Sequence, residues 1–352
     1  MKGFQELLTA IRKEANQPVR LMEVCGGHTH AIRKFGINSL LPDSITLLSG
    51  PGCPVCVTHT GFIDRAIHLA QNYPVIISTF GDLIRVPGSG QSLEAYRAAG
   101  ADIRVVLSPL QGLELADSNK DKQVVFLGIG FETTAPSVAA TIMTAKSRGI
   151  KNFSVLSAHK IMPPAMSALA GEQLNLDGFI CPGHVSTITG SGIFEFLARD
   201  HGIPCVISGF EASDILESIL MLIRQINGNK ATVEIQYKRA VKPHGNLKAL
   251  NIMNEVFMVS DDWWRGLGHI PKSGLIPRGN YAFFDTLQRF SVPEFPDKHN
   301  QGCRCGEIIR GLIAPPECTL FGTSCTPDSP AGACMVSSEG ACQAFYQYQG
   351  IL

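Results

Sequence analysis

Residues 44–56, Ser-Ile-Thr-Leu-Leu-Ser-Gly-Pro-Gly-Cys-Pro-Val-Cys, place two cysteines in a turn between a predicted strand and a predicted helix. The apolar run before Gly50 indicates the strand, and apolar residues spaced three and four apart after Cys56 indicate the helix. Such a turn gathers unpaired backbone N–H groups and the positive end of the helix dipole, which stabilise a thiolate. Cys53 and Cys56 are therefore predicted to be a redox-active or metal-handling pair. Half of a structural zinc site is the alternative, although the chain has no second Cys-x-x-Cys.

A second cysteine turn lies upstream, in residues 25–30, Cys-Gly-Gly-His-Thr-His. Residues 20–24 are predicted to form a short strand and a helix begins near Ala31, so Cys25, His28 and His30 crowd one turn. Sulfur and nitrogen donors at this spacing suit a soft or borderline transition metal. His28 could instead deprotonate the neighbouring thiol. The alternative interpretation is a structural cysteine with two capping or surface histidines.

Strand and helix patterns alternate from residue 20 to residue 237, as parallel βαβ units require. We therefore predict an α/β fold with two parallel-sheet domains that face a crevice, followed by an irregular region that is rich in cysteine. The predicted boundaries are 1–121, 122–240 and 241–352. Ligands of parallel sheets bind beyond the carboxyl ends of the strands. Both cysteine turns lie at such ends and can therefore face one crevice.

Polar residues also follow the predicted strands of the second domain. Glu132, His159, His184 and Glu211 stand at such positions and could converge on the crevice of that domain. Exposed loop positions for the carboxylates and turn hydrogen bonds for the histidines are the simpler alternatives. Neither a Gly-x-Gly-x-x-Gly fingerprint nor a Walker motif follows these strands, so a nucleotide site has little support.

Composition narrows the classes of function. The 352 residues carry a formal net charge of 0, so no basic field points to nucleic acid. The longest apolar run is far shorter than a membrane span, and the amphipathic N-terminal segment differs from a secretory signal. We therefore expect a cytoplasmic protein without a membrane partner. Eleven cysteines in a reducing compartment are better explained as ligands or redox groups than as a disulfide framework.

Six of these cysteines fall in the last part of the chain, which is poor in regular helix patterns. They are Cys303, Cys305, Cys318, Cys325, Cys334 and Cys342. Four thiolates can hold a [4Fe–4S] cluster or a zinc ion, and irregular loops without paired Cys-x-x-Cys knuckles favour the cluster. Cys303 and Cys305 would point in opposite directions in an extended chain, so only one of them is predicted to be a ligand. The other, with Cys334, would lie near enough to the cluster to form a dithiol–disulfide couple.

The two cysteine turns resemble motifs of the HypD family of [NiFe]-hydrogenase maturation proteins. So do residues 130–136, Gly-Phe-Glu-Thr-Thr-Ala-Pro, residues 182–186, Pro-Gly-His-Val-Ser, and the Cys-x14-Cys-x6-Cys-x16-Cys tail. The resemblance spans nearly the whole chain, and the family's spacing selects Cys303 over Cys305 as a cluster ligand. It therefore implies an oxygen-sensitive [4Fe–4S] cluster held by Cys303, Cys318, Cys325 and Cys342, with Cys305 and Cys334 as the candidate redox dithiol.

The resemblance also implies a scaffold on which an iron atom acquires cyanide and carbon monoxide, as Fe(CN)2CO, before delivery to the hydrogenase large subunit. HypC-type small chaperones and HypE-type cyanide donors are the implied partners. Because such iron needs soft donors, Cys25 becomes the candidate iron ligand. The other candidate catalytic residues are His28, Cys53, Cys56, Glu132 and His184. A stand-alone iron–sulfur thiol/disulfide oxidoreductase of the ferredoxin:thioredoxin reductase type is the alternative function.

Overall fold

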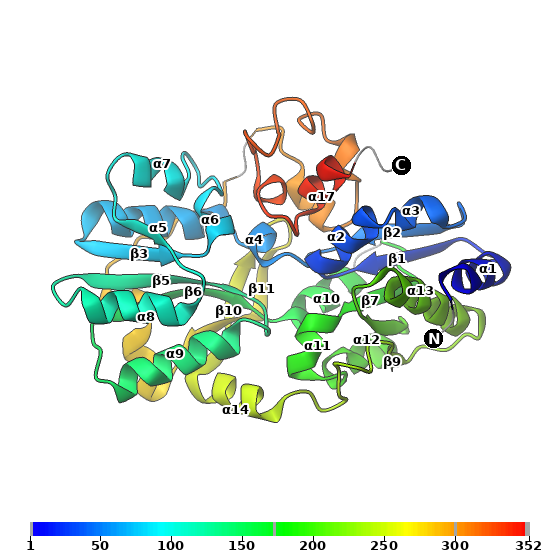
Figure 1. Ribbon diagram of the computed structural model, residues 1–352, viewed down its shortest axis with the longest axis horizontal. Coiled ribbons are helices and arrows are strands. Elements are labelled where there is room, and N and C mark those ends of the chain that lie inside the picture. The colour runs from blue at the N-terminus through cyan, green and yellow to red at the C-terminus, as the bar shows by residue number, and fades with distance from the viewer. Residues whose placement is uncertain (1–2, 172–173, 299–300, 349–352) are drawn as a thin grey trace.

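The computed structural model describes residues 3–171, 174–298 and 301–348, and its strands form two sheets that lie side by side (Figure 1). The first sheet has five strands in the order β2-β1-β7-β8-β9, and all its neighbouring strands are parallel. Its strands are β1 (Val19–Glu23), β2 (Ile45–Ser49), β7 (Gly178–Pro182), β8 (Cys205–Ser208) and β9 (Val233–Ile235).

The second sheet has six strands in the order β10-β11-β6-β5-β3-β4. Its strands are β3 (Val75–Thr79), β4 (Ile103–Val105), β5 (Gln123–Gly130), β6 (Phe153–Lys160), β10 (Phe257–Trp264) and β11 (Gly268–Pro277). The strands β3 to β6 pair in parallel, whereas β11 joins β6, and β10 joins β11, in antiparallel fashion. The predicted α/β class with parallel-dominated sheets is confirmed, and the β10–β11 hairpin adds an antiparallel edge that the sequence pattern did not predict.

The chain passes back and forth between the two sheets. Residues 19–49 and 178–235 supply the first sheet, and residues 75–160 and 257–277 supply the second. The predicted boundaries after residues 121 and 240 therefore do not coincide with the sheets. An alternating pattern indicates strands and helices but cannot indicate which strands pair, and β1 pairs with β7 from far along the chain.

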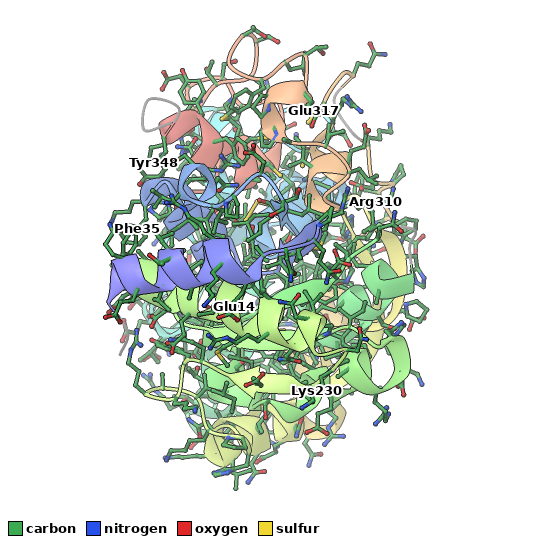
Figure 2. The ribbon with its side chains drawn as sticks, turned by 90° about the vertical axis from the view of Figure 1, so that its right-hand side faces the viewer. Glu14, Phe35, Lys230, Arg310, Glu317 and Tyr348 are labelled. Atoms are coloured by element: carbon green, nitrogen blue, oxygen red, sulfur yellow. A yellow bond between two sulfur atoms is a disulfide. The ribbon has the colours of Figure 1, made fainter. Side chains whose placement is uncertain are left out.

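Helices cover the sheets because each buries one apolar face. In the first sheet, α1 (Phe4–Glu14) packs against α13 (Ala212–Asn227), where Glu14, labelled in Figure 2, accepts hydrogen bonds from Arg224. In the second sheet, α8 (Pro109–Ser118) packs on β5, and α9 (Ala135–Ser147) packs between α8 and α14 (Leu247–Val256).

Shorter elements complete the fold. The remaining α-helices are α2 (Gly26–Lys34), α3 (Ile37–Leu40), α4 (Pro54–Val57), α5 (Thr60–Asn72), α6 (Gly81–Ile84), α7 (Leu93–Ala98), α10 (Met162–Gly171), α11 (Gly183–Thr189), α12 (Glu195–His201), α15 (Thr286–Arg289), α16 (Cys305–Ile309) and α17 (Ala341–Gln347). In the part of the chain that the structure describes, the 3-10 helices are η1 (Gly192–Phe194), η2 (Gly279–Phe284), η3 (Pro315–Glu317) and η4 (Ala333–Met335). Within the described residues, no helix is long and apolar enough to cross a membrane.

One apolar core joins both sheets to the C-terminal region. It contains Leu127 of β5, Phe179 of β7, Cys56 of α4 and Cys342 of α17. The C-terminal region, which contains α16, η4 and α17, lies over α2 and α4 where the two sheets meet (Figure 1). The cysteine-rich tail is therefore packed onto the two cysteine turns and is not a separate appendage.

Candidate functional site

The two cysteine turns lie side by side, as predicted. The strands β1 and β2 are parallel neighbours whose last residues, Glu23 and Ser49, are in register. Beyond that edge, Gly26 N donates a hydrogen bond to Gly52 O at 3.0 Å, and Gly50 N donates one to Glu23 O at 2.8 Å. The parallel pairing thus brings Cys25 and the Cys53–Cys56 turn to one edge of the first sheet.

Gly52 allows this contact because it has no side chain. A Cβ atom at Gly52 would overlap the backbone of Cys25. Gly52→Ala is therefore expected to push the turns apart and lower the free energy of unfolding by about 1–3 kcal/mol, the usual cost of overpacking. Urea unfolding measures this change. Gly90→Ala, in a loop with open space around it, is the matched control, and equal stability of the two variants would contradict the close contact.

Cys25 is a buried thiol at the N-cap of α2, with only 8% of its surface exposed. Burial, followed by the negative charge of Glu339, raises the pKa of Cys25 to about 12, and Glu23 acts in the same direction. The carboxyl group of Glu23 is close by, because its Oε2 accepts a hydrogen bond from Cys25 N at 3.1 Å. Stabilisation by the helix N-terminus does not outweigh these effects, so without a metal the thiol of Cys25 keeps its proton at neutral pH.

His28 is fully buried and makes its contacts on the side of β8. Its Nε2 lies 3.2 Å from Ser208 O and 3.0 Å from Gly209 O, so Nε2 carries the proton. Burial lowers the pKa of His28 to about 4, so the ring is neutral, and Nδ1 has no partner among the described residues. The imidazole of His28 makes no hydrogen bond to Cys25 in the described structure, although His28 N donates one to Cys25 O at 2.8 Å. His30, the other predicted donor, instead pairs with the Tyr348 hydroxyl at 3.2 Å.

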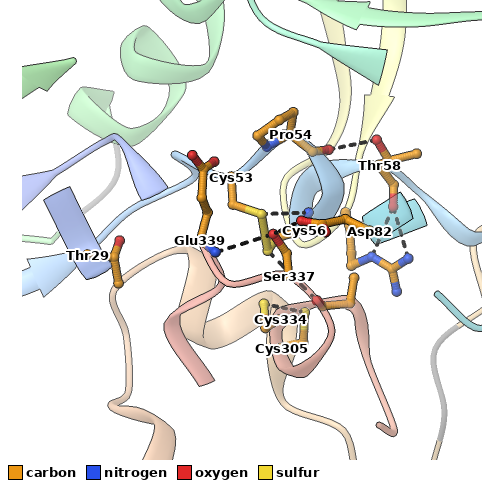
Figure 3. Close-up of a disulfide and its surroundings, with 12 residues drawn as sticks. Thr29, Cys53, Pro54, Cys56, Thr58, Asp82, Cys305, Cys334, Ser337 and Glu339 are labelled. Atoms are coloured by element: carbon orange, nitrogen blue, oxygen red, sulfur yellow. Dashed lines mark hydrogen bonds between the residues drawn. A yellow bond between two sulfur atoms is a disulfide. The ribbon is translucent and has the colours of Figure 1, made fainter. Parts of the chain in front are cut away.

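Cys53 and Cys56 are joined by a disulfide (Figure 3). Cys53 is the N-cap of α4, and its Sγ accepts a hydrogen bond from Cys56 N at 3.2 Å. The Sγ of Cys56 lies 4.0 Å from the carbonyl oxygen of Ala333 in η4. The disulfide therefore faces the element that carries Cys334.

The six C-terminal cysteines line one cavity. Its other walls are mostly apolar, formed by Ile308, Leu320, Phe321, Gly332 and Met335. Cys305 Sγ and Cys334 Sγ are 3.0 Å apart, on the side of this region that faces the disulfide (Figure 3). Among the described residues, no three Cys, His, Asp or Glu side chains come together closely enough to hold a single metal ion. The thiols are instead distributed around the cavity.

Three contacts fix the cysteine-rich region to α2, the helix whose N-cap is Cys25. The Arg33 guanidinium of α2 lies 3.2 Å from the ring centroid of Phe345, and His30 of α2 binds Tyr348. Glu339, just before α17, packs against Gly26 so closely that a Cβ atom on the glycine would overlap it. Cys342 and Cys25 thus lie at the starts of two helices that pack on each other.

The polar residues predicted for a second-domain crevice are divided between the sheets. Glu132 follows β5 and His159 lies in β6, both strands of the second sheet, whereas His184 and Glu211 follow strands of the first. No hydrogen bond or ring contact joins the two pairs in the described structure. Glu132 accepts a hydrogen bond from Met162 N at 2.9 Å, and burial raises its pKa to about 7. Its second carboxylate oxygen has no partner among the described residues.

Phe210 is a neighbour of the site that sequence reasoning did not single out. His184 and His28 both stack on its ring, with centroid separations of 3.9 Å and 4.7 Å. A Cβ atom on Gly27 would come within 3.0 Å of the same ring. The ring therefore links the Cys25 turn to the exposed His184. Its position after β8 was visible in the sequence, but an isolated aromatic residue carries no signal for this contact.

Comparison with known proteins agrees with these motifs. The sequence model of the HypD family, described as the Hydrogenase formation hypA family, matches residues 2–349. The chain is 48% identical to the hydrogenase maturation factor HypD of Azotobacter vinelandii over 354 residues, covering 98% of this chain and 93% of that protein. It is 44% identical to the hydrogenase maturation factor HypD of Escherichia coli over 351 residues, covering 99% and 94%. The chain therefore belongs to the HypD family of hydrogenase maturation factors.

Proposed function

We propose that the chain is the scaffold on which the Fe(CN)2CO group of [NiFe]-hydrogenase is assembled, and that its thiols supply electrons to that process. One observation carries this proposal: sulfur-bearing groups follow one another from the cavity to Cys25. The cavity contains Cys305 and Cys334, η4 brings Cys334 next to the Cys53–Cys56 disulfide, and that disulfide's turn touches Cys25.

The cavity suits a resident [4Fe–4S] cluster. Four thiolates are the ordinary ligands of such a cluster, and thiols spread over an otherwise apolar wall match a group of several atoms better than a single ion. Cys303, Cys318, Cys325 and Cys342 would hold it. When bound, the cluster supplies one-electron transfer. Cys325 Sγ already accepts a hydrogen bond from Ala331 N at 3.3 Å, an interaction that stabilises a thiolate ligand.

Cys305 and Cys334 form a dithiol between the cavity and the disulfide. At 3.0 Å their sulfurs are near enough to form a disulfide, with loss of two electrons and two protons. The thiolate of one such dithiol can attack the Cys53–Cys56 disulfide, which then accepts the same two electrons and two protons. We propose that the two pairs exchange electrons in this way.

Cys25 is the proposed ligand of the iron substrate. Cyanide and carbon monoxide bind low-spin ferrous iron, which prefers a soft thiolate donor. Because ligands must lose their protons, the buried Cys25 thiol would release its proton when iron binds. HypC-type and HypE-type proteins are the proposed partners for delivery of iron and cyanide, and the hydrogenase large subunit is the proposed recipient. The proposed compartment is the cytoplasm.

We expect the disulfide between Cys53 and Cys56 to form and break reversibly. The turn places both sulfurs within bonding reach, and the N-terminus of α4 favours the thiolate that appears on reduction. Thiol counting under mild oxidation, with and without reductant, is expected to show more thiols after reduction. The variant Cys53→Ser is the control and is expected to lower this increase by two, because the Cys305–Cys334 pair remains. If Cys53 and Cys56 stay free under mild oxidation, their redox role is wrong.

Infrared spectroscopy of the anaerobically purified protein with its HypC-type partner tests the proposed function. Cyanide and carbon monoxide stretching bands on the complex are expected of a scaffold. A stand-alone thiol/disulfide oxidoreductase would reduce partner disulfides and show no such bands. Absence of the bands, with rapid reduction of a partner disulfide, would therefore replace the proposal with that alternative.

A further inference from the structure

Arg265 is a buried arginine in the turn that follows β10. Only 3% of its surface is exposed. Its Nε and Nη2 donate hydrogen bonds to Thr58 O at 3.0 Å and 2.9 Å, and its backbone N donates to Val57 O at 2.8 Å. Thr58 directly follows α4, the helix of the Cys53–Cys56 disulfide, and is labelled beside it in Figure 3. Within the described residues, no carboxylate forms an ion pair with Arg265.

The same turn lies against the start of the cysteine-rich region. A Cβ atom on Gly266 would come within 2.7 Å of Gly306 Cα, so the two glycines allow their backbones to touch. Gly306 is next to Cys305 in α16. Arg265 directly precedes Gly266, and its positive charge acts on the thiols of both Cys303 and Cys305. The guanidinium therefore lies close enough to act electrostatically on the cavity.

A buried cation is costly unless an opposite charge faces it. Thr58 O supplies only a neutral carbonyl, whereas the thiols of Cys303 and Cys305 lie within electrostatic reach of Arg265 and become anionic when they bind a metal. We propose that Arg265 is the built-in counter-ion of the thiolate-bound cluster and sets its reduction potential. This inference rests on the proposed function, since it needs the cluster in the cavity, but it assigns a role to a residue outside the cysteine motifs.

The charge of Arg265 determines the direction in which it shifts the reduction potential of the cluster. The potential of an iron–sulfur cluster depends on net charge, hydrogen bonds and burial around it. The reduced cluster carries one more negative charge than the oxidised one, so a nearby fixed cation favours the reduced form. Arg265 is a positioning residue as well, because the hydrogen bonds to Thr58 O hold the disulfide helix against the same turn.

Reduction of the anaerobic protein with dithionite, followed by electron paramagnetic resonance, tests the inference. In Arg265→Gln, which loses the charge but can still donate to Thr58 O, the ratio of reduced to oxidised cluster at a fixed potential is expected to fall about tenfold, or about 59 mV for one electron. Arg265→Lys keeps the charge and is expected to stay near the wild-type potential. Arg199→Gln is the control and is expected to keep the wild-type potential, because Arg199 is exposed, pairs with Asp200 and lies on α12, outside the cysteine-rich region.

Iron and sulfide analysis of the wild type comes first, because it tests whether a cluster is present separately from whether Arg265 sets its potential. A wild type without iron and sulfide would overturn the proposed function together with this inference. A cluster in the wild type, with the same potential in Arg265→Gln, would overturn only the role of Arg265. If Arg265→Gln loses the cluster, the cluster content of Arg265→Lys distinguishes the two explanations. A cluster retained in Arg265→Lys supports the counter-ion role, and a cluster lost from both variants shows that the charge of Arg265 is not what holds it.

Discussion

Cys25→Ala is expected to fold and keep its iron–sulfur cluster, yet carry no Fe(CN)2CO and support no hydrogenase maturation. Cys25 lies outside the six-cysteine cavity, so its removal leaves every proposed cluster ligand in place. It is a small buried side chain at a helix N-cap, and alanine fits the space that it occupies. Iron and sulfide analysis measures the cluster, and cyanide and carbon monoxide infrared bands measure the bound iron group.

Two further variants test whether the loss in Cys25→Ala comes from the missing thiolate at that position. Cys25→Ser is expected to be nearly as poor as alanine, because an alkoxide is a harder donor and is rarely ionised at neutral pH. Cys205→Ala removes another buried thiol, from β8, far from the cysteine turns in sequence and outside the cavity, and is expected to keep both the bands and maturation. Wild-type infrared bands and normal hydrogenase activity in Cys25→Ala would refute the assignment.

The cysteine turns were predictable because their geometry is local. Strand, turn and helix follow one another within residues 44–56, and parallel strands place their carboxyl ends on one edge. The sequence also indicated that Cys25 and Cys53 could face one crevice. Which strands would be neighbours was not predictable, because sheet order depends on contacts between distant segments. That is why the predicted boundaries and the grouping of Glu132 with His184 differ from the arrangement in space.

Electrostatics at Cys25 could not be read from the sequence either. The sequence predicted a thiolate stabilised by a helix N-terminus only for the Cys53–Cys56 turn, and it predicted Cys25 to be a metal ligand or a thiol that His28 deprotonates. In the folded chain, Glu339 comes from more than three hundred residues away and packs on Gly26, so burial and negative charge raise the pKa of Cys25 instead. The position of Arg265 beside the cavity has the same origin, because only the folded hairpin brings it to Cys303 and Cys305.

Cys318→Ala is expected to lose most of its cluster iron and sulfide. Cys318 lines the cavity from the segment after η3, and its Sγ lies 3.9 Å from Gly302 O on the opposite chain segment. Removal of one thiolate from a four-thiolate site leaves one iron without its protein ligand and makes the cluster labile. Anaerobic iron and sulfide analysis, with the visible absorbance of the purified protein, measures the loss. Full retention in this variant would remove Cys318 from the ligand set.

The cavity supplies its own matched controls for that result. Cys334→Ala changes a thiol in the same cavity that is proposed to belong to the redox dithiol, so it is expected to keep the cluster and lose electron exchange with the disulfide. Comparison of Cys303→Ala with Cys305→Ala then identifies the remaining ligand. Cys305 contacts Cys334 at 3.0 Å, which favours Cys303 over Cys305 as the cluster ligand. Cluster loss in Cys305→Ala with retention in Cys303→Ala would exchange their roles and leave the four-thiolate site intact.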